Sequence, residues 1–230
     1  MNILNIETSG KICSVALTGE GVLELQLDDR EGMQHANKVA PFAERCMEEL
    51  RRKELKLDAV SVSIGPGSYT GLRIGLSFAK GLAFGLGIPL IGVNTLKILA
   101  VKAMFRNFDW TGEEILVPMI DARRMEVFTA AYDFHLKDVI KPQAMVLDDN
   151  SFRSLLDSGR QLYFMGDGAE KAKEVIKHEN AHWIDGLLPQ AKDMLALSEK
   201  AFREKDFLDI AYCTPLYLKE YRTTKPKNKF

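Results

Sequence analysis

The chain of 230 residues has a formal charge of −1 and is 46% hydrophobic and 27% charged, as expected for one large or two small globular domains. This charge balance argues against a broad nucleic-acid-binding face, and no apolar run reaches the roughly 20 residues that span a bilayer. Because no basic segment with a following apolar run opens the sequence, we expect no signal peptide and a cytoplasmic location. The three cysteines lack C-x-x-C spacing and are expected to be reduced.

The first half of the chain predicts an antiparallel meander followed by alternating helices and strands. Period-2 alternation or short apolar runs place the expected strands at 3–7, 12–18, 22–27, 60–64 and 89–93. Helical spacing of apolar residues places the expected helices at 36–50, 71–86 and 95–105. Pro41 predicts a kink or a late start of the first helix, and Ser68 or Thr70 can cap the second.

The second half begins as the first does, with three strands and a helix. Strands are expected at 115–120, 126–133, 139–147 and 162–165, and helices at 151–157, 169–177 and 191–204. The repeated order predicts a duplicated ribonuclease-H-like unit, an α/β fold of mixed β-sheet flanked by helices, as in the actin, sugar-kinase and heat-shock ATPase superfamily. The polar connector 106–114 marks the boundary, giving an N-terminal half at 1–107 and a smaller C-terminal half at 108–230.

The helix at 71–86 is apolar around most of its circumference. Gly71, Gly75, Ala79 and Ala83 recur at every fourth position and form a smooth stripe, while Arg73, Ser77 and Lys80 form a narrow polar line. Such a helix is buried on more than one side, so we expect its own sheet on one side and a second protein layer on the other. Packing on its own sheet alone is the alternative, and it explains only one face.

Four segments resemble a known family. ILNIETSGKICSVAL, SIGPGSYTGLRIGLSFAKGLA, IPLIGVN and VPMIDARRMEVFTAAY look like the TsaB (YeaZ) family, and MGDGAEKA and PLYLKEY extend the resemblance beyond residue 135. That family is the dimerisation subunit of the bacterial complex that makes threonylcarbamoyladenosine next to the tRNA anticodon. The resemblance implies a non-catalytic subunit that binds and supports the catalytic, TsaD-type subunit.

The resemblance also implies which surface carries the contact. In the family, the first two helices of the N-terminal half bundle with those of the catalytic subunit or of a second copy, and a TsaE-type ATPase and tRNA are reached through the complex. The expected interface residues are Ala36, Val39, Ala40, Ala43, Met47, Gly71, Leu72, Arg73, Gly75, Leu76, Ala79 and Leu82. On this expectation, Gly75→Arg abolishes association and leaves the fold intact, unless Gly75 faces the sheet.

The catalytic chemistry of the sister family is not expected here. That family places two histidines four residues apart after the matching Asn, which puts two imidazoles on one helical face for a metal. In this chain Asn94 is followed by Thr95 and Leu99 at those positions. A hydroxyl and an isobutyl group do not replace two imidazoles, so we expect no metal and no catalysis by this chain alone.

Nucleotide binding stays open at the level of the sequence. In the superfamily, phosphates lie between two hairpins, and the matching residues here are Glu7, Thr8, Ser9, Asp121, Gly166, Asp167 and Gly168. These residue types also occur in turns for conformational reasons alone. We expect no resident cofactor, with ATP or ADP as the open alternative, either in this chain or at the joint with the partner. A stand-alone ATP-dependent kinase or ATPase of the same fold is the alternative function.

Two further features have local explanations. His178, Glu179 and His182 match H-E-x-x-H, with Glu199 as a conceivable third ligand, which makes a zinc peptidase the second alternative function. Their polar flanks indicate a solvated helix end instead. The basic residues of 219–230 indicate a flexible tail that either touches RNA phosphates or is only solvated.

Overall fold

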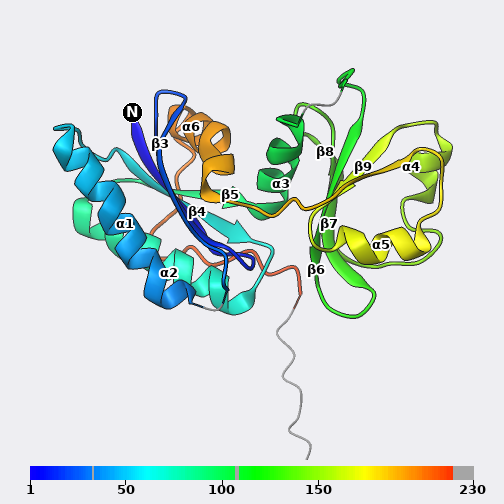
Figure 1. The fold of residues 1–230 in the computed structure, drawn as a ribbon, viewed down its shortest axis with the longest axis horizontal. Helices are drawn as coiled ribbons and strands as arrows, with labels where there is room; N and C mark the ends of the chain where they lie inside the picture. The colour runs from blue at the N-terminus through cyan, green and yellow to red at the C-terminus, as the bar shows by residue number, and fades with distance from the viewer. Residues whose placement is uncertain (33, 107–108, 220–230) are drawn as a thin grey trace, which may run out of the picture.

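The computed structural model describes residues 1–32, 34–106 and 109–219, which form two lobes, each built on a five-stranded sheet (Figure 1). The first sheet has the order β3-β2-β1-β4-β5 and the second the order β10-β9-β6-β7-β8. The repeated mixed sheet confirms the predicted duplicated α/β fold. No helix of these residue ranges is long and apolar enough to cross a membrane.

The first sheet combines an antiparallel meander with two parallel strands. Its members are β1 (Asn2–Glu7), β2 (Cys13–Gly19), β3 (Val22–Asp29), β4 (Ala59–Gly65) and β5 (Leu90–Asn94). β1, β2 and β3 pair antiparallel, whereas β4 lies parallel to β1, and β5 lies parallel to β4. Each parallel connection passes through a helix, as parallel pairing requires.

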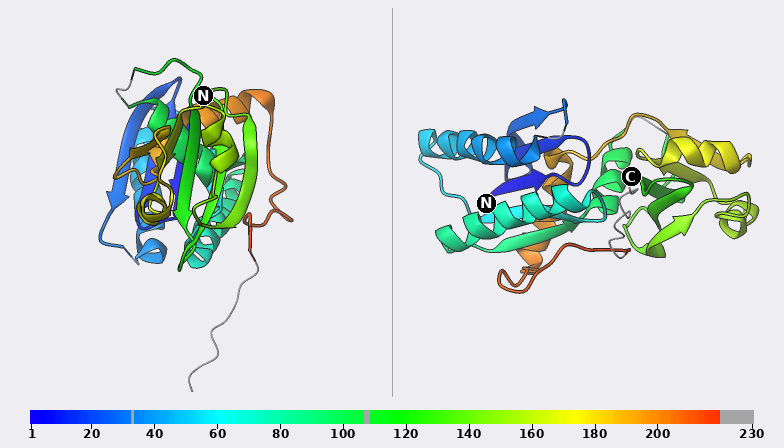
Figure 2. Two further views of the ribbon diagram at one scale, coloured as in Figure 1. Left: turned by 90° about the vertical axis from the view of Figure 1, so that its right-hand side faces the viewer. Right: turned by 90° about the horizontal axis from the view of Figure 1, so that it is seen from below.

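Helices cover both faces of this sheet because its strands are apolar on both sides (Figures 1 and 2). α1 (His35–Arg52) and α2 (Tyr69–Leu86) pack with Leu4 and Ile6 on one face. α3 (Thr95–Met104) and α6 (Leu195–Glu204) cover the other face, where Ile3 points. Adjacent β1 residues thus serve opposite cores, as the two-residue period of a strand dictates.

The ends of the two long helices follow their local sequence. Ser68 caps α2 by accepting a hydrogen bond from the Gly71 amide at 3.2 Å, and Gly87 ends that helix in the left-handed conformation. α1 begins at His35, so the late start suggested by Pro41 is wrong; Pro41 lies inside the helix.

The small-residue stripe of α2 faces this chain's own sheet, not a partner. A Cβ atom at Gly71 would lie 2.1 Å from the Thr8 carbonyl oxygen, and one at Gly75 would lie 2.2 Å from Thr8 Oγ1. The Thr8 hydroxyl donates to the Gly71 carbonyl at 2.8 Å, and Ala79 is fully buried. The expectation that the stripe contacts a second protein is therefore wrong, because the glycines serve a close internal approach.

The second sheet repeats the meander with shorter helices. It consists of β6 (Ile115–Asp121), β7 (Glu126–Tyr132), β8 (Asp138–Val146), β9 (Leu162–Met165) and β10 (Ala181–Ile184), with α4 (Arg153–Asp157) and α5 (Ala169–Val175). The sequence did not predict β10, and α5 ends two residues before the expected 177. Among the described strands, β10 pairs with β9 alone, in parallel. This pairing defines it as a strand, because its own sequence has no clear alternation.

After the second lobe the chain returns to the first. The 3-10 helix η1 (Ala191–Met194) and α6 pack on the first sheet, and residues 205–219, the C-terminal strap, continue along its edge (Figure 2). The Leu208 amide donates to the Leu90 carbonyl at 2.8 Å, and the Leu216 amide donates to the Ile64 carbonyl at 2.7 Å. The boundary expected at 107 falls at residues 107 and 108, outside the described ranges, and stays a prediction.

The contrast between Gly75 and Gly81 tests this packing. Gly75→Ala forces a methyl group against Thr8 and is expected to lower the free energy of unfolding by about 1 to 3 kcal/mol. Gly81→Ala meets open space and is expected to raise it by up to about 1 kcal/mol, because alanine favours the helix. Urea denaturation of both variants measures the difference. Equal effects of the two substitutions would contradict the inward orientation of Gly75.

Candidate functional site

The turn between β1 and β2 holds the first group of predicted nucleotide-proximal residues, and this chain encloses it. Glu7 and Thr8 are fully buried, and Ser9 is nearly so. The Ser68 amide donates to the Ser9 carbonyl at 2.7 Å, so the loop of Gly65, Pro66 and Gly67 lies against the turn. A Cβ atom at Gly67 would lie 2.5 Å from the same carbonyl oxygen. This glycine loop thus packs on the protein's own β1–β2 turn.

Two more segments close the same turn from other directions. His35 Nε2, at the start of α1, donates to the Gly10 carbonyl at 2.9 Å. A Cβ atom at Gly10 would lie 3.9 Å from Pro189 Cγ. Three segments therefore cover Glu7, Thr8 and Ser9 from solvent: the start of α1, the glycine loop and the segment before η1.

Burial of the Glu7 carboxyl group disfavours its charged form. Burial away from water raises the pKa of Glu7 from its ordinary 4.5 to about 7, although hydrogen bonds from Ser9 oppose the shift. One of these is the bond from the Ser9 amide to Glu7 Oε1, at 2.5 Å. Oε1 thus bonds its own hairpin, whereas Oε2 is buried without a hydrogen-bond partner among the described residues.

The second group lies at the end of β6 and the start of α5. Asp167 Oδ1 accepts a hydrogen bond from the Asp121 amide at 3.0 Å, so the structure brings these two residues together. Asp121 is exposed and pairs with Lys171. Partial burial acts in the opposite direction, but hydrogen bonds from Lys171 and from the Arg123 amide lower the pKa of Asp121. No hydrogen bond or ion pair within the described ranges joins this group to Glu7, Thr8 or Ser9.

The turn of Gly166, Asp167 and Gly168 has a structural explanation. A Cβ atom at Gly166 would lie 2.2 Å from the Met119 carbonyl oxygen, and the Gly168 amide donates to that same oxygen at 3.1 Å. The Ala169 amide donates to the Gly166 carbonyl. Because these amides already have partners, the start of the short helix α5 does not offer them to a phosphate.

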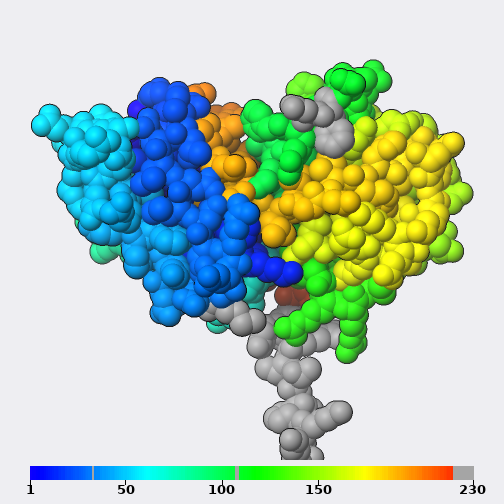
Figure 3. Space-filling model, in the orientation of Figure 1, coloured from blue at the N-terminus to red at the C-terminus, as the bar shows by residue number. Residues whose placement is uncertain are grey.

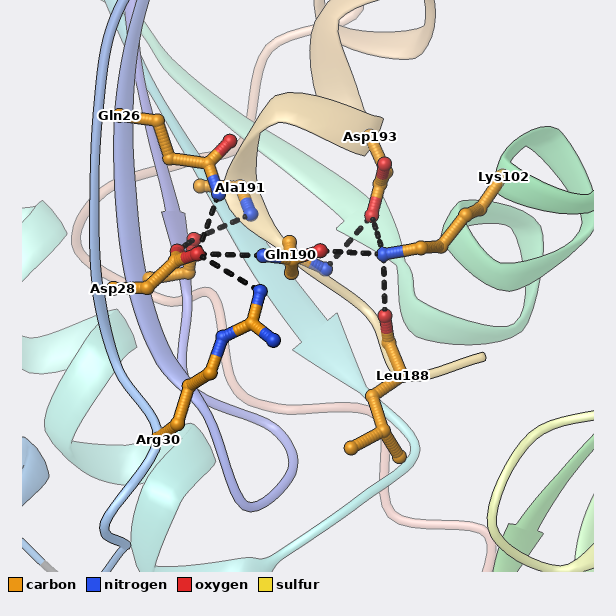
Figure 4. A network of polar contacts seen from close by, with 9 residues as sticks. Gln26, Asp28, Arg30, Lys102, Leu188, Gln190, Ala191 and Asp193 are labelled. Carbon is orange, nitrogen blue, oxygen red and sulfur yellow. Dashed lines mark hydrogen bonds and ion pairs between the residues drawn. The ribbon is translucent and has the colours of Figure 1, made fainter. Parts of the chain in front are cut away.

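The space between the lobes on one side is filled by residues 185–194, the crossing segment. Figure 3 shows its golden-orange atoms between the two lobes, and Figure 4 shows how it is held. Lys102 Nζ on α3 donates to the Leu188 carbonyl at 2.8 Å, to Gln190 Oε1 at 2.6 Å and to Asp193 Oδ2 at 2.8 Å. Both members of the Lys102–Asp193 ion pair are mostly buried. These contacts fix the segment to α3.

The same segment is fixed to the outer strands of the first sheet. Gln190 Nε2 donates to Asp28 Oδ2 at 2.6 Å, and the Ala191 amide donates to Ser14 Oγ at 2.9 Å (Figure 4). Gln26 also donates to Asp28. The sequence did not predict this network. Gln190 and Asp193 form a capping box at the start of η1. Their spacing of three residues is the one feature of the local sequence that indicates part of this network.

The positions that correspond to the two histidines of the sister family lie in the core. Thr95 is fully buried, and Leu99, which is nearly so, belongs to the cluster that joins α3 to the second sheet. A Cβ atom at Gly166 would lie 3.2 Å from Leu99 Cδ1. At this place the chain has apolar packing between its two lobes.

The H-E-x-x-H segment does not form the helix that a zinc peptidase requires. His178 follows α5, and His182 lies on β10, stacked on Tyr163. His178 Nε2 contacts Asp157 Oδ1 at 3.2 Å, and His182 Nε2 donates to Gln161 Oε1 at 2.5 Å. Within the described ranges, no three or more His, Cys, Asp or Glu side chains are grouped to hold a metal ion. The segment lies in a loop and a strand, which contradicts the expected helix end.

Glu199, the conceivable third ligand, serves the first lobe. Its Oε1 accepts a hydrogen bond from the Gly21 amide at 2.6 Å, and its Oε2 pairs with Arg203 at 2.6 Å. The basic tail lies outside the described residues except for Lys219, which pairs with Glu126.

The predicted partner interface divides into buried and exposed residues. The buried members are Val39, Ala43, Gly71, Leu72, Gly75, Leu76 and Ala79, all in this chain's own core. Because these residues lie inside the first lobe and not on its surface, the prediction is wrong for them. The members at least partly exposed are Ala36, Ala40, Met47, Arg73 and Leu82.

An exposed face remains on the outer side of α1 and α2, and the sequence predicted only part of it. Phe84 is 78% exposed, Ile74 and Phe78 are half-buried, and a Cβ atom at Gly81 would meet nothing within 4 Å. Together with Ala36, Ala40 and Met47 of the neighbouring helix α1, these residues make up what we call the exposed helix face. The helical period could have separated its outward positions from the inward stripe.

Comparisons with known proteins agree on one family. The family model TsaD, described as tRNA N6-adenosine threonylcarbamoyltransferase, matches residues 31–220. The tRNA threonylcarbamoyladenosine biosynthesis protein TsaB of Escherichia coli is 30% identical over 95% of both chains. The structure of YeaZ from Pseudomonas aeruginosa has a TM-score of 0.77 at 26% identity, covering 94% of this chain and 99% of that one.

A kinase shares the architecture alone. The inorganic polyphosphate/ATP-glucomannokinase of an Arthrobacter species has a TM-score of 0.51 at 11% identity, covering 88% of this chain and 99% of that one. At this identity the likeness shows the fold and not the activity. It shows that the two lobes of this chain share the overall fold of that kinase.

Glu7→Gln tests the burial of the Glu7 carboxyl. Folded Glu7 holds its proton more tightly than unfolded Glu7, so its contribution to stability is complete below pH 4.5 and is lost as the pH rises to about 7. The loss amounts to about 3 kcal/mol. At pH 8 we expect Glu7→Gln to have a higher free energy of unfolding than the wild type, with little difference at pH 4.5.

Chemical denaturation between pH 4.5 and 8 measures this difference. Glu113→Gln makes the same chemical change at an exposed carboxylate and serves as the control. If Glu7→Gln and the wild type have the same pH dependence, the Glu7 carboxyl is not buried as described.

Proposed function

Because the chain belongs to the family described as TsaD and, within it, to the TsaB (YeaZ) group of tRNA threonylcarbamoyladenosine biosynthesis proteins, we propose that it is a non-catalytic subunit of this pathway. It takes part in forming threonylcarbamoyladenosine on tRNA by binding the threonylcarbamoyltransferase subunit and supporting it. The TsaE-type ATPase and tRNA are reached through that complex.

The exposed helix face carries this proposal. Phe84 and Leu86 are 78% and 46% exposed near the end of α2, although phenylalanine and leucine usually lie inside a fold. α1 lies beside α2 and adds exposed Ala36 and Ala40, whose small side chains let another helix approach. Exposed apolar residues grouped on two adjacent helices mark a surface for helix packing.

The enclosed hairpin supports a binding role over an independent kinase. A kinase or ATPase needs a carboxylate and free amides facing the nucleotide. Here Glu7 is buried with a raised pKa, and the Gly168 amide is engaged by Met119. The nucleotide role expected for these residues remains a prediction, for this chain or for the joint with the partner; of the two hairpins' carboxylates, Glu7 is buried and Asp121 is exposed but paired with Lys171.

Support of the partner follows from mass action. A subunit that binds only the active arrangement of its partner increases the population of that arrangement relative to the inactive one by a factor set by its free concentration divided by its dissociation constant. No group of this chain has to touch the reacting atoms. The proposed occupant of the exposed helix face is the transferase subunit, and a second copy of this chain competes for the same face.

Gly81→Arg tests the face without disturbing the fold. The site is open, so the variant is expected to keep the stability of the isolated chain within about 1 kcal/mol. A long charged side chain at the centre of a packed helical interface is expected to weaken binding of the transferase subunit by roughly thirtyfold or more. Calorimetric titration of the two purified subunits measures this, and Gly81→Ala is the matched control.

The activity assay tests the role itself. Threonylcarbamoyl transfer to unmodified tRNA is measured with the catalytic subunit and the ATPase, with and without this chain. We expect transfer to depend on this chain and to fall in parallel with the affinity of Gly81→Arg. Transfer that proceeds equally well without the chain would overturn the supporting role. Undiminished binding of Gly81→Arg would instead remove the contact from this face.

A further inference from the structure

A pocket with two basic side chains in its lining lies where the C-terminal strap crosses α2. It has a volume of about 220 Å³ and is lined by both elements. α2 contributes the residues of its polar line, Arg73, Ser77 and Lys80, and the strap contributes Thr214 and Tyr217. The pocket is outside the hairpins and the exposed helix face described above.

The pocket is positively charged without a compensating carboxylate. Its lining contains one guanidinium and one ammonium group and no acidic side chain. Lys80 Nζ donates to the carbonyl oxygens of Ala211 at 3.3 Å and Cys213 at 3.2 Å, and Arg73 Nε donates to the Tyr217 hydroxyl at 3.1 Å. Both cations thus have neutral partners, which leaves their charge available to an anion.

The donors are held in place before any ligand arrives. The Arg73 guanidinium lies 4.1 Å from the centre of the Tyr69 ring, and the rings of Tyr69 and Tyr217 stack at 5.0 Å. Arg73 uses its Nε for Tyr217, which leaves its terminal nitrogens as donors, and Lys80 keeps one of its three protons. Within the described ranges, the hydroxyl groups of Ser77 and Thr214 make no hydrogen bond with protein.

We propose that this pocket binds a small tetrahedral oxyanion, either inorganic phosphate or the phosphate group of a nucleotide. A fixed guanidinium, an ammonium and hydroxyl donors are the groups that recognise phosphate oxygens. Because Arg73 and Lys80 belong to α2 while Thr214 and Tyr217 belong to the strap, the bound anion joins the strap to α2. This proposal does not depend on the proposed function.

Binding of sodium phosphate to the full chain tests the proposal. Calorimetric titration at constant ionic strength, with chloride as the balancing anion, separates site binding from general screening. We expect saturable binding that weakens by about tenfold or more in the double variant Arg73→Gln and Lys80→Gln, because two charged donors are lost. Lys141→Gln removes an exposed lysine on β8 and is the matched control, expected to bind as the wild type does.

The double variant also removes the hydrogen bonds that hold the strap, so a loss of phosphate binding could come from a displaced strap. Ser77→Ala is the second variant that separates these two causes. Ser77 makes no contact that holds the strap, so its removal is expected to weaken phosphate binding about threefold with unchanged stability. A parallel arm with ADP distinguishes the two sources of the anion: competition between ADP and phosphate assigns the pocket to a nucleotide phosphate, and phosphate binding alone assigns it to the free anion. No saturable binding, or equal affinities of the wild type, Ser77→Ala and the double variant, would overturn the proposal.

Discussion

The close approach of α2 to the β1–β2 turn is the contact on which the first lobe depends. Only a residue without a Cβ atom fits at Gly71 and Gly75, where the helix meets Thr8. The Thr8 hydroxyl then bonds the Gly71 carbonyl at 2.8 Å. Interior glycines cost helix stability, and this contact offsets that cost through burial and a satisfied buried hydroxyl.

This contact also decides what the lobe can do. With α2 on one side, the glycine loop on another and Pro189 on a third, the turn from Glu7 to Gly10 is enclosed in protein. The same packing turns the opposite side of α2 outward, with Gly81 and Phe84. The fold is shared with a kinase, but a shared fold does not fix the function. In this chain the same packing leaves the outer side of α2 as an exposed surface.

The second constraint is the return of the chain to the first lobe. The crossing segment is fixed by Lys102 and Asp28, and the strap by backbone hydrogen bonds to β4 and β5. A Cβ atom at Gly65 would lie 2.8 Å from the Leu216 carbonyl oxygen, and one at Gly92 would lie 2.8 Å from Leu208 Cδ1. These two glycines of the first lobe make room for the C-terminal strap, which follows them by more than 100 residues in the chain. The chain therefore leaves the first lobe for the second and then returns to pack on it.

The sequence by itself determined most of the helices and strands, the duplicated fold and the family, because hydrophobic periodicity and a long local motif are properties of neighbouring residues. It did not determine β10, which depends on pairing with β9, or the contacts of Gln190 and Asp193, which lie far from their partners in the chain. Only the tertiary structure decided which side of α2 is inward. A glycine stripe allows close approach equally to a sheet and to a partner helix, and the choice was made by Thr8, more than 60 residues earlier in the chain.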